Sequence, residues 1–261
     1  MKGRDGMRKK AILLVSFGSS HPDAMEKTIL VLQKQIADTY PEYRVYLALT
    51  SKKILKKLES KGLFYDCLET AMERMQLDGM ESVVIQPTHI IYGTEYERLV
   101  QEIETYRDGF TSLKIGTPLL STPEDYKKVI HAIIEEVHLE EDECLLLMGH
   151  GTEHYAHTSY PALEYMFHTL GYEHVYVGTM EGFPGLPEIL HKFKAKQVKR
   201  VVLFPFLFVP GKHVKDDMVG AENSWKCQLL EAGYEVRAVM MGLGEIKGVR
   251  RLLIEHMEGE L

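Results

Sequence analysis

Two histidines and two glutamates in this chain of 261 residues have side chains suited to metal binding and proton transfer. His150 stands between two glycines in GHG, and His213 follows a Pro-Gly pair in PGKH. Glu95 lies in GTEY, and Glu181 lies in TMEG. Imidazoles and carboxylates are ordinary ligands of divalent first-row metals, and a positioned imidazole or carboxylate can also accept a proton. These residues predict a metal or proton-transfer site.

Two pairs of segments indicate that the sequence is internally duplicated. The run AILLVSFGS aligns with CLLLMGHGT, which brings Phe17 opposite His150. The run VVIQPTHIIYGTE aligns with VVLFPFLFVPGKH, which brings Glu95 opposite His213. Equivalent loops therefore carry a glutamate in one half and a histidine in the other. We expect two related domains that face each other across a cleft containing the site.

Strand-like and helix-like patterns alternate along the chain, which predicts an α/β fold with a parallel β-sheet flanked by helices in each of two similar domains. Pro22 suits the first turn of the first helix, and its apolar stripe consists of Met25, Ile29, Leu32 and Ile36. The predicted strands lie near 11–16, 43–48, 82–87, 112–116, 143–148, 174–178, 199–204 and 234–239. In open parallel sheets, ligands bind beyond the carboxyl ends of the strands, where His150, Glu181 and His213 are expected.

The junction between the domains is expected near the helix that Thr122 caps and Pro123 begins. This gives an N-terminal domain of residues 1–125 and a C-terminal domain of residues 126–261. The last helix, near 245–258, could pack on either domain.

Composition restricts the class of partner. The formal net charge of −7 argues against a general nucleic-acid binder, and no apolar run is long enough to cross a bilayer. Three widely spaced cysteines with no Cys-x-x-Cys pair favour a reducing cytoplasm. The chain has no Gly-rich phosphate motif, so no organic cofactor is predicted. Whether the chain forms a homo-oligomer is left open.

Each candidate residue also has a simpler interpretation. His150 could be an incidental histidine in a tight turn between a strand and a helix. His213 and Glu95 could be polar residues in the first turns of exposed helices, and Glu181 could be a solvated loop glutamate. His154 and His157 resemble a metal cluster in spacing, but we expect at most supporting contacts from them. The duplication favours the functional interpretation for Glu95 and His213, because solvated surface does not explain a matched glutamate and histidine.

The motifs LLLMGHGT, VVIQPTHIIYGTEYERL and VVLFPFLFVPGKHVKDDM resemble those of the class II tetrapyrrole chelatases. The resemblance is to the anaerobic sirohydrochlorin cobaltochelatases (CbiK type) of cobalamin biosynthesis, and it covers almost the whole chain. It implies a cytoplasmic lyase that takes Co²⁺ as the substrate metal and sirohydrochlorin as the tetrapyrrole, with precorrin-2 as a second candidate. Two protons leave the macrocycle as the metal enters.

Carried over by motif, the resemblance implies that His150 is the principal base and metal ligand, with His213 opposite. Glu95 is implied to assist deprotonation as a catalytic residue, and Glu181 to supply a further metal ligand. Which glutamate binds the metal is left open.

Two other hypotheses compete with insertion of Co²⁺ into sirohydrochlorin. Fe²⁺ or Ni²⁺ could replace Co²⁺ in sirohaem or related tetrapyrrole synthesis, because metal affinities at sites with nitrogen and oxygen ligands overlap. A two-lobed protein that binds a small solute without turnover is the alternative from a different class. Eight substrate carboxylates would also need local positive charge, for which the candidates are Lys52, Lys53, Arg98, Lys212 and Lys215.

Overall fold

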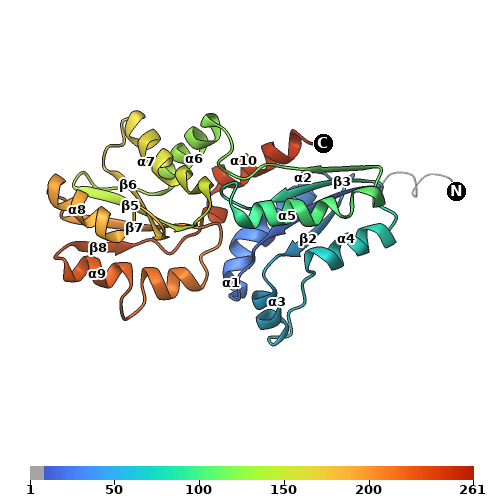
Figure 1. Ribbon diagram of the computed structural model, residues 1–261, viewed down its shortest axis with the longest axis horizontal. Coiled ribbons are helices and arrows are strands. Elements are labelled where there is room, and N and C mark those ends of the chain that lie inside the picture. Colours follow the sequence, from blue (N-terminus) through green and yellow to red (C-terminus); the bar gives the residue numbers. More distant parts are fainter. Residues whose placement is uncertain (1–8) are drawn as a thin grey trace. The chain divides into compact units, whose positions relative to one another are not determined.

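The computed structural model describes residues 9–261, which divide into two compact units. The first unit comprises residues 9–119 together with Arg250–Leu261, and the second comprises Leu120–Val249. The first eight residues of the predicted N-terminal domain lie outside the described range. In each unit a sheet is covered by helices (Figure 1).

In the first unit, four strands alternate along the chain with helical segments. The strands are β1 (Lys10–Ser16), β2 (Arg44–Leu49), β3 (Ser82–Pro87) and β4 (Ser112–Ile115). The helical segments are α1 (Pro22–Met25), η1 (Glu26–Leu30), α2 (Val31–Thr39), α3 (Lys52–Glu59), α4 (Leu68–Leu77), α5 (Thr94–Glu104) and η2 (Arg107–Gly109). Helix α10 (Lys247–Glu258) joins this unit from Arg250 onward, where the Arg250 guanidinium donates to Gln35 Oε1 at 2.9 Å.

The second unit repeats this alternation. Its strands are β5 (Glu143–Gly151), β6 (Val175–Glu181), β7 (Arg200–Phe206) and β8 (Glu235–Ala238). Its helical segments are α6 (Pro123–Glu136), η3 (Tyr155–Thr158), α7 (Ser159–Thr169), α8 (Leu186–Lys196), η4 (Val214–Met218), α9 (Trp225–Glu231) and η5 (Leu243–Glu245).

The two sheets share one topology. Both are fully parallel, with strand orders β2-β1-β3-β4 and β6-β5-β7-β8. The predicted α/β fold class is therefore confirmed. Gly18 after β1 and Gly151 at the end of β5 have φ of +88° and +84°, so the aligned glycine keeps the same left-handed turn in both copies.

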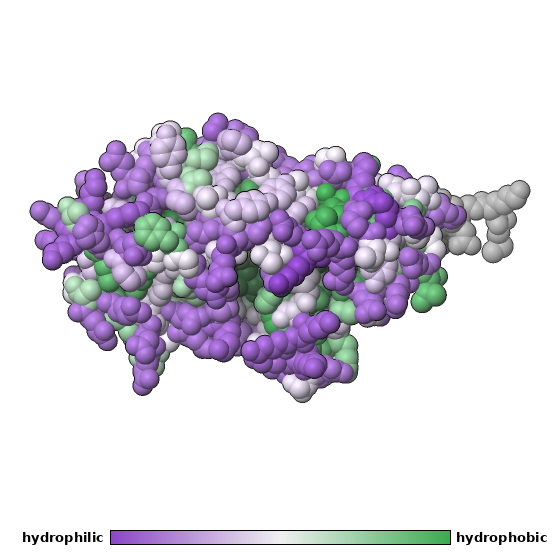
Figure 2. All heavy atoms as spheres, in the orientation of Figure 1, coloured by the Kyte–Doolittle hydropathy of each residue, from purple (hydrophilic) through white to green (hydrophobic). Residues whose placement is uncertain are grey.

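Apolar side chains fill the interior of each unit, while hydrophilic side chains cover most of the face seen in Figure 2. Strands β1 and β5 are almost continuously buried, as parallel strands covered on both faces must be. The predicted stripe of the first helix is confirmed, because all four of its apolar side chains are fully buried. A π-helical turn, η1, interrupts that helix, which the spacing alone did not predict.

Capping residues set the ends of two other helices. Thr122 and Asp125 form a reciprocal capping box before α6, so the predicted cap is confirmed. The last helix begins at Lys247, later than predicted, because the Glu245 carboxylate accepts the Gly242 N–H at 3.0 Å and closes a separate 3₁₀ turn. Among residues 9–261, no helix is long and apolar enough to span a bilayer.

Candidate metal and proton-transfer site

Three of the four predicted site residues gather at the carboxyl ends of strands in the second unit. His150 lies near the end of β5, and Glu181 is the last residue of the neighbouring strand β6. The β5–β6 register pairs Gly151 with Glu181. His213 follows β7, the other neighbour of β5, and immediately precedes η4. The parallel topology therefore brings together residues up to 63 positions apart, His150 and His213 being the extremes.

The imidazoles of His150 and His213 face one another. Their ring centroids are 4.9 Å apart, with the planes nearly perpendicular. Asp217, a residue that the sequence analysis missed, contacts the second ring: its Oδ2 lies 2.6 Å from His213 Nδ1. The i, i+4 spacing in HVKDD was the available signal, since it can bring two side chains to one side of a helical turn.

Hydrogen-bonding partners define which ring nitrogen is free in each histidine. His150 Nδ1 lies 3.1 Å from the Gly151 carbonyl oxygen and 4.0 Å from Glu181 Oε2, and both of these oxygens are acceptors. His213 Nδ1 faces the Asp217 carboxylate in the same way. A neutral imidazole facing an acceptor at Nδ1 carries its proton there. Nε2 of each ring therefore keeps the lone pair needed to bind a metal or accept a proton.

The glycines around His150 are required by close packing. A Cβ on Gly149 would lie 2.4 Å from the ring of Tyr160, and a Cβ on Gly151 would lie 1.7 Å from the Glu181 carbonyl oxygen. Tyr160 is buried, and its hydroxyl accepts the Gly151 N–H at 3.4 Å. Burial raises the pKa of Tyr160 to about 12, so its hydroxyl stays protonated near neutral pH. The GHG motif thus seats the strand end against α7 and β6.

The three side chains are close but are not a closed metal cage. In residues 9–261, no three His, Cys, Asp or Glu side chains already form a group that could hold a metal ion. The side chains of His150, His213 and Glu181 are 43%, 48% and 66% exposed, respectively. They therefore have room to rotate toward an incoming ion.

Glu95 lies in the first unit, at the second position of α5. Its carboxylate pairs with Arg98 at 3.2 Å, and more than half of the side chain is exposed. Gly93 caps α5, while its aligned partner Gly211 lies two residues before His213, so both aligned side chains stand at the start of a helical segment. An acidic group at the start of a helix also benefits from the positive end of the helix dipole.

The cations proposed to bind substrate carboxylates differ in whether they already pair with an acidic side chain. Lys212 pairs with Asp216 at 3.0 Å, and Arg98 pairs with Glu95. Lys52 and Lys53 are exposed at the start of α3. The structure therefore favours the α3 lysines, because neither of them forms an ion pair with any residue in the range 9–261.

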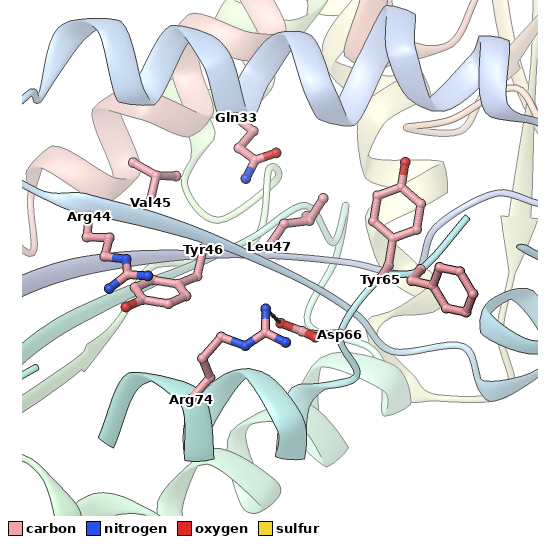
Figure 3. Close-up of a pocket in the computed structure, with 9 residues that line it drawn as sticks. Gln33, Arg44, Val45, Tyr46, Leu47, Tyr65, Asp66 and Arg74 are labelled. Atoms are coloured by element: carbon pink, nitrogen blue, oxygen red, sulfur yellow. Dashed lines mark ion pairs between the residues drawn. The ribbon is translucent and has the colours of Figure 1, made fainter. Parts of the chain in front are cut away.

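A cavity of about 330 Å³ lies elsewhere in the first unit, along strand β2 (Figure 3). Arg44 and Arg74 line it, and they pair with Asp78 and Asp66, each at 2.9 Å. None of the four predicted site residues lines this cavity. Each of the two arginines already pairs with an aspartate, so we assign the cavity no ligand.

His89 follows β3 in the first unit. Part of the residue is accessible, but both ring nitrogens are shielded from solvent and hydrogen-bond to no described residue. Its ring meets that of Tyr96 edge to face, with centroids 6.1 Å apart. Burial lowers the pKa of His89 to about 4, so the native state keeps this imidazole neutral.

His89 is expected to destabilise the native state in mild acid. Between about pH 6.5 and pH 4 the unfolded chain binds a proton at His89 that the native chain does not, so stability falls as pH falls through this range. The free energy of unfolding lost between pH 7 and pH 5 should be about 1–2 kcal/mol smaller in His89→Leu than in the wild type. Urea denaturation at both pH values measures this difference, with exposed His131→Leu as the control. Equal losses in His89→Leu and wild type would rule out the effect.

Comparisons with known proteins extend over nearly the whole chain. A family model described as cobalt chelatase (CbiK) matches residues 10–261. A sirohydrochlorin cobaltochelatase from Salmonella typhimurium is 33% identical over 256 residues, covering 97% of this chain and 97% of the relative. The sirohydrochlorin cobaltochelatase CbiKC from Nitratidesulfovibrio vulgaris is 34% identical over 256 residues, covering 96% of this chain and 90% of the relative.

The fold also matches a solved structure. SirB from Bacillus subtilis with Fe³⁺ superposes with a TM-score of 0.68 over 96% of this chain and 95% of that chain, at 13% identity. At this identity the likeness is one of fold.

Proposed function

The chain belongs to the CbiK family of cobalt chelatases, and we propose that it inserts Co²⁺ into sirohydrochlorin in anaerobic cobalamin biosynthesis, with release of two protons. The observation that carries this proposal is the facing pair His150 and His213, each with Nδ1 directed at an acceptor and Nε2 left with a lone pair. Two such nitrogens provide neutral ligands for a divalent ion.

The reaction needs weak metal ligands and proton acceptors. Co²⁺ must leave its water and protein ligands for the four macrocycle nitrogens, and two pyrrolic N–H protons must depart. His150 and His213 hold the ion through Nε2, and Glu181 adds a further oxygen ligand or orients His150 through Nδ1. A preformed cage would retain the ion, so an open, exposed set of ligands suits a metal that must be handed on.

Glu95 is proposed as the group that assists deprotonation of the macrocycle. A carboxylate can accept a pyrrolic proton and pass it to water, and its negative charge favours an approaching cation. The ion pair with Arg98, at 3.2 Å, holds the Glu95 carboxylate at the start of α5.

Anaerobic absorbance spectroscopy tests the proposed function. Purified protein is mixed with sirohydrochlorin and Co²⁺, Fe²⁺ or Ni²⁺, and each rate is compared with the same mixture lacking protein. Acceleration that is greatest with Co²⁺ supports the proposal, while greatest acceleration with Fe²⁺ or Ni²⁺ would assign a different substrate metal. Binding of the macrocycle without acceleration by any metal would indicate a tetrapyrrole-binding protein instead.

Asp217 is proposed to hold the His213 ring with Nε2 toward the metal. Asp217→Leu should therefore raise the KM for Co²⁺ by about 10-fold or more, since partners that orient metal-binding histidines contribute 10–100-fold to metal affinity. Asp217→Asn keeps an oxygen acceptor for Nδ1–H and should recover most of the affinity. Initial rates of insertion at varied Co²⁺ measure both.

The neighbouring Asp216 supplies the matched control. Its carboxylate pairs with Lys212 and not with His213, so Asp216→Asn should leave the KM for Co²⁺ unchanged. A wild-type KM in Asp217→Leu would show that the His213 ring needs no such partner.

The cytoplasm is the proposed location, and the tetrapyrrole and the divalent metal are the proposed partners. The three cysteines, Cys67, Cys144 and Cys227, are all free thiols, which suits a reducing compartment. The proposed reaction requires no organic cofactor, nucleic acid or membrane.

A further inference from the structure

His157 joins the two loops that carry His150 and Glu181. It lies on the 3₁₀ turn η3, just before α7. The Thr152 backbone N–H donates to His157 Nδ1 at 3.2 Å, and His157 Nε2 lies 2.7 Å from the Phe183 carbonyl oxygen. A backbone N–H can only donate and a carbonyl can only accept. His157 therefore accepts at Nδ1 and donates at Nε2, so both ring nitrogens are used.

The loop that His157 contacts is otherwise secured at its base. Thr179 N–H donates to the Pro184 carbonyl at 2.8 Å, which closes the chain around residues 180–183. Glu181 lies within this closed segment. Gly182 has a φ of +96°, and a Cβ there would lie 2.5 Å from His157 Cε1. The imidazole is thus seated directly against the residue that follows Glu181, and only glycine fits beneath it.

The same stretch of chain also supports the His150 loop. The rings of His157 and Tyr160 contact each other in a tilted arrangement, with centroids 5.3 Å apart. Tyr160 in turn packs on Gly149 and accepts the Gly151 N–H. Segment η3 and the start of α7 together therefore contact the residues on both sides of His150 and the residues just after Glu181.

We propose that His157 is a positioning residue that fixes the Glu181 loop relative to His150 and so sets the spacing of the metal-binding side chains. This inference rests on the proposed function, because it assigns His157 a role in presenting Glu181 and His150 to Co²⁺. His157 does not bind the ion itself, since neither of its nitrogens has a free lone pair directed away from the two loops. Its influence passes through the backbone at Thr152 and Phe183.

Two variants separate the hydrogen bonds from the bulk of the ring. His157→Phe keeps an aromatic ring against Gly182 and Tyr160 but removes both hydrogen bonds. His157→Gln supplies one amide oxygen to accept from Thr152 and one amide N–H to donate to Phe183. His168→Phe is the matched control, because His168 lies on α7, the helix that follows η3, and its Nε2 contacts the Val175 carbonyl at 2.8 Å, at the opposite end of β6 from Glu181.

Two measurements are made on the full chain. Isothermal titration calorimetry with Co²⁺ alone gives metal affinity, and initial rates at varied Co²⁺ and varied sirohydrochlorin give the two KM values. His157→Phe should weaken Co²⁺ binding and raise the KM for Co²⁺ by about 10-fold or more, with the KM for sirohydrochlorin unchanged. His157→Gln should recover most of this loss, and His168→Phe should bind Co²⁺ like the wild type.

Wild-type Co²⁺ affinity in His157→Phe would overturn the proposal. So would equal losses in His157→Phe and His168→Phe, which would indicate a general loss of stability. Failure of the proposed function is a separate result, because it appears as absent acceleration by the wild type. In that case the calorimetric comparison still tests whether His157 positions the metal-binding residues.

Discussion

Replacing His150 with alanine is expected to abolish Co²⁺ insertion while leaving the fold intact. The imidazole supplies a proposed metal ligand and proton acceptor, and loss of a positioned acid-base group alone costs about 100-fold or more in rate. The side chain is 43% exposed and packs in no hydrophobic core, so its removal leaves no sizeable cavity. Anaerobic absorbance spectroscopy with sirohydrochlorin and Co²⁺ measures the rate, and circular dichroism checks the fold.

A second histidine in the same unit controls for the loss of an imidazole. His131 is exposed on α6, and His131→Ala should retain the wild-type rate. If His150→Ala also inserted Co²⁺ at the wild-type rate, His150 would be neither the base nor an essential ligand. If metal binding were lost but insertion persisted at high Co²⁺, the ligand role would stand without the base role.

The fold was predictable because its determinants are local or repeated. The apolar spacing of Met25, Ile29, Leu32 and Ile36 defines a buried helical face without reference to the rest of the chain. The duplication added information of longer range, since two aligned copies imply two sheets of the same topology, as observed. Gly151 and its counterpart Gly18 persist in both copies because both turns require a positive φ.

For the candidate site, only the proximity of its main members was predictable. His150 and His213 follow strands that a parallel sheet must bring together, so the sequence motifs and strand positions sufficed. Asp217, Tyr160 and His157 were missed or undervalued because their roles depend on contacts with particular atoms: an imidazole Nδ1, a backbone N–H and a backbone carbonyl. Residue type and spacing do not encode such contacts, which depend on side-chain direction and on loops distant in sequence.

The two glycines of the GHG motif also have a role that depends on atomic contacts and not on residue type alone. In the sequence, Gly149 and Gly151 flank His150, but residue type alone does not show what fills the space beside them. In the structure, the space beside each glycine is occupied by protein: the Tyr160 ring beside Gly149 and the Glu181 carbonyl beside Gly151. The motif therefore serves the packing that holds His150, and this role can be measured independently of the ligand.

Gly151→Ala is expected to damage both stability and metal insertion. A Cβ at this position would lie 1.7 Å from the Glu181 carbonyl oxygen, a backbone atom that cannot move unless the β5–β6 pairing opens. The positive φ adds about 1–2 kcal/mol of strain for a residue with a Cβ. The free energy of unfolding should fall by about 3 kcal/mol or more, as for other severe steric substitutions. Urea denaturation measures the loss of stability, and the protein that remains folded should show a raised KM for Co²⁺, because opening the strand pair displaces Glu181 from His150.

Gly171→Ala separates the clash from the backbone strain. Gly171 has a φ of +91°, but nothing lies within 4 Å of the Cβ it would acquire. It should therefore cost only the strain of about 1–2 kcal/mol and leave the KM for Co²⁺ at its wild-type value. If Gly151→Ala destabilised the protein no more than Gly171→Ala, β5 and β6 would not approach each other beside His150 as closely as the structure shows. If it destabilised the protein more but left metal insertion intact, the position of Glu181 would not matter to the reaction, and its proposed role beside His150 would fail.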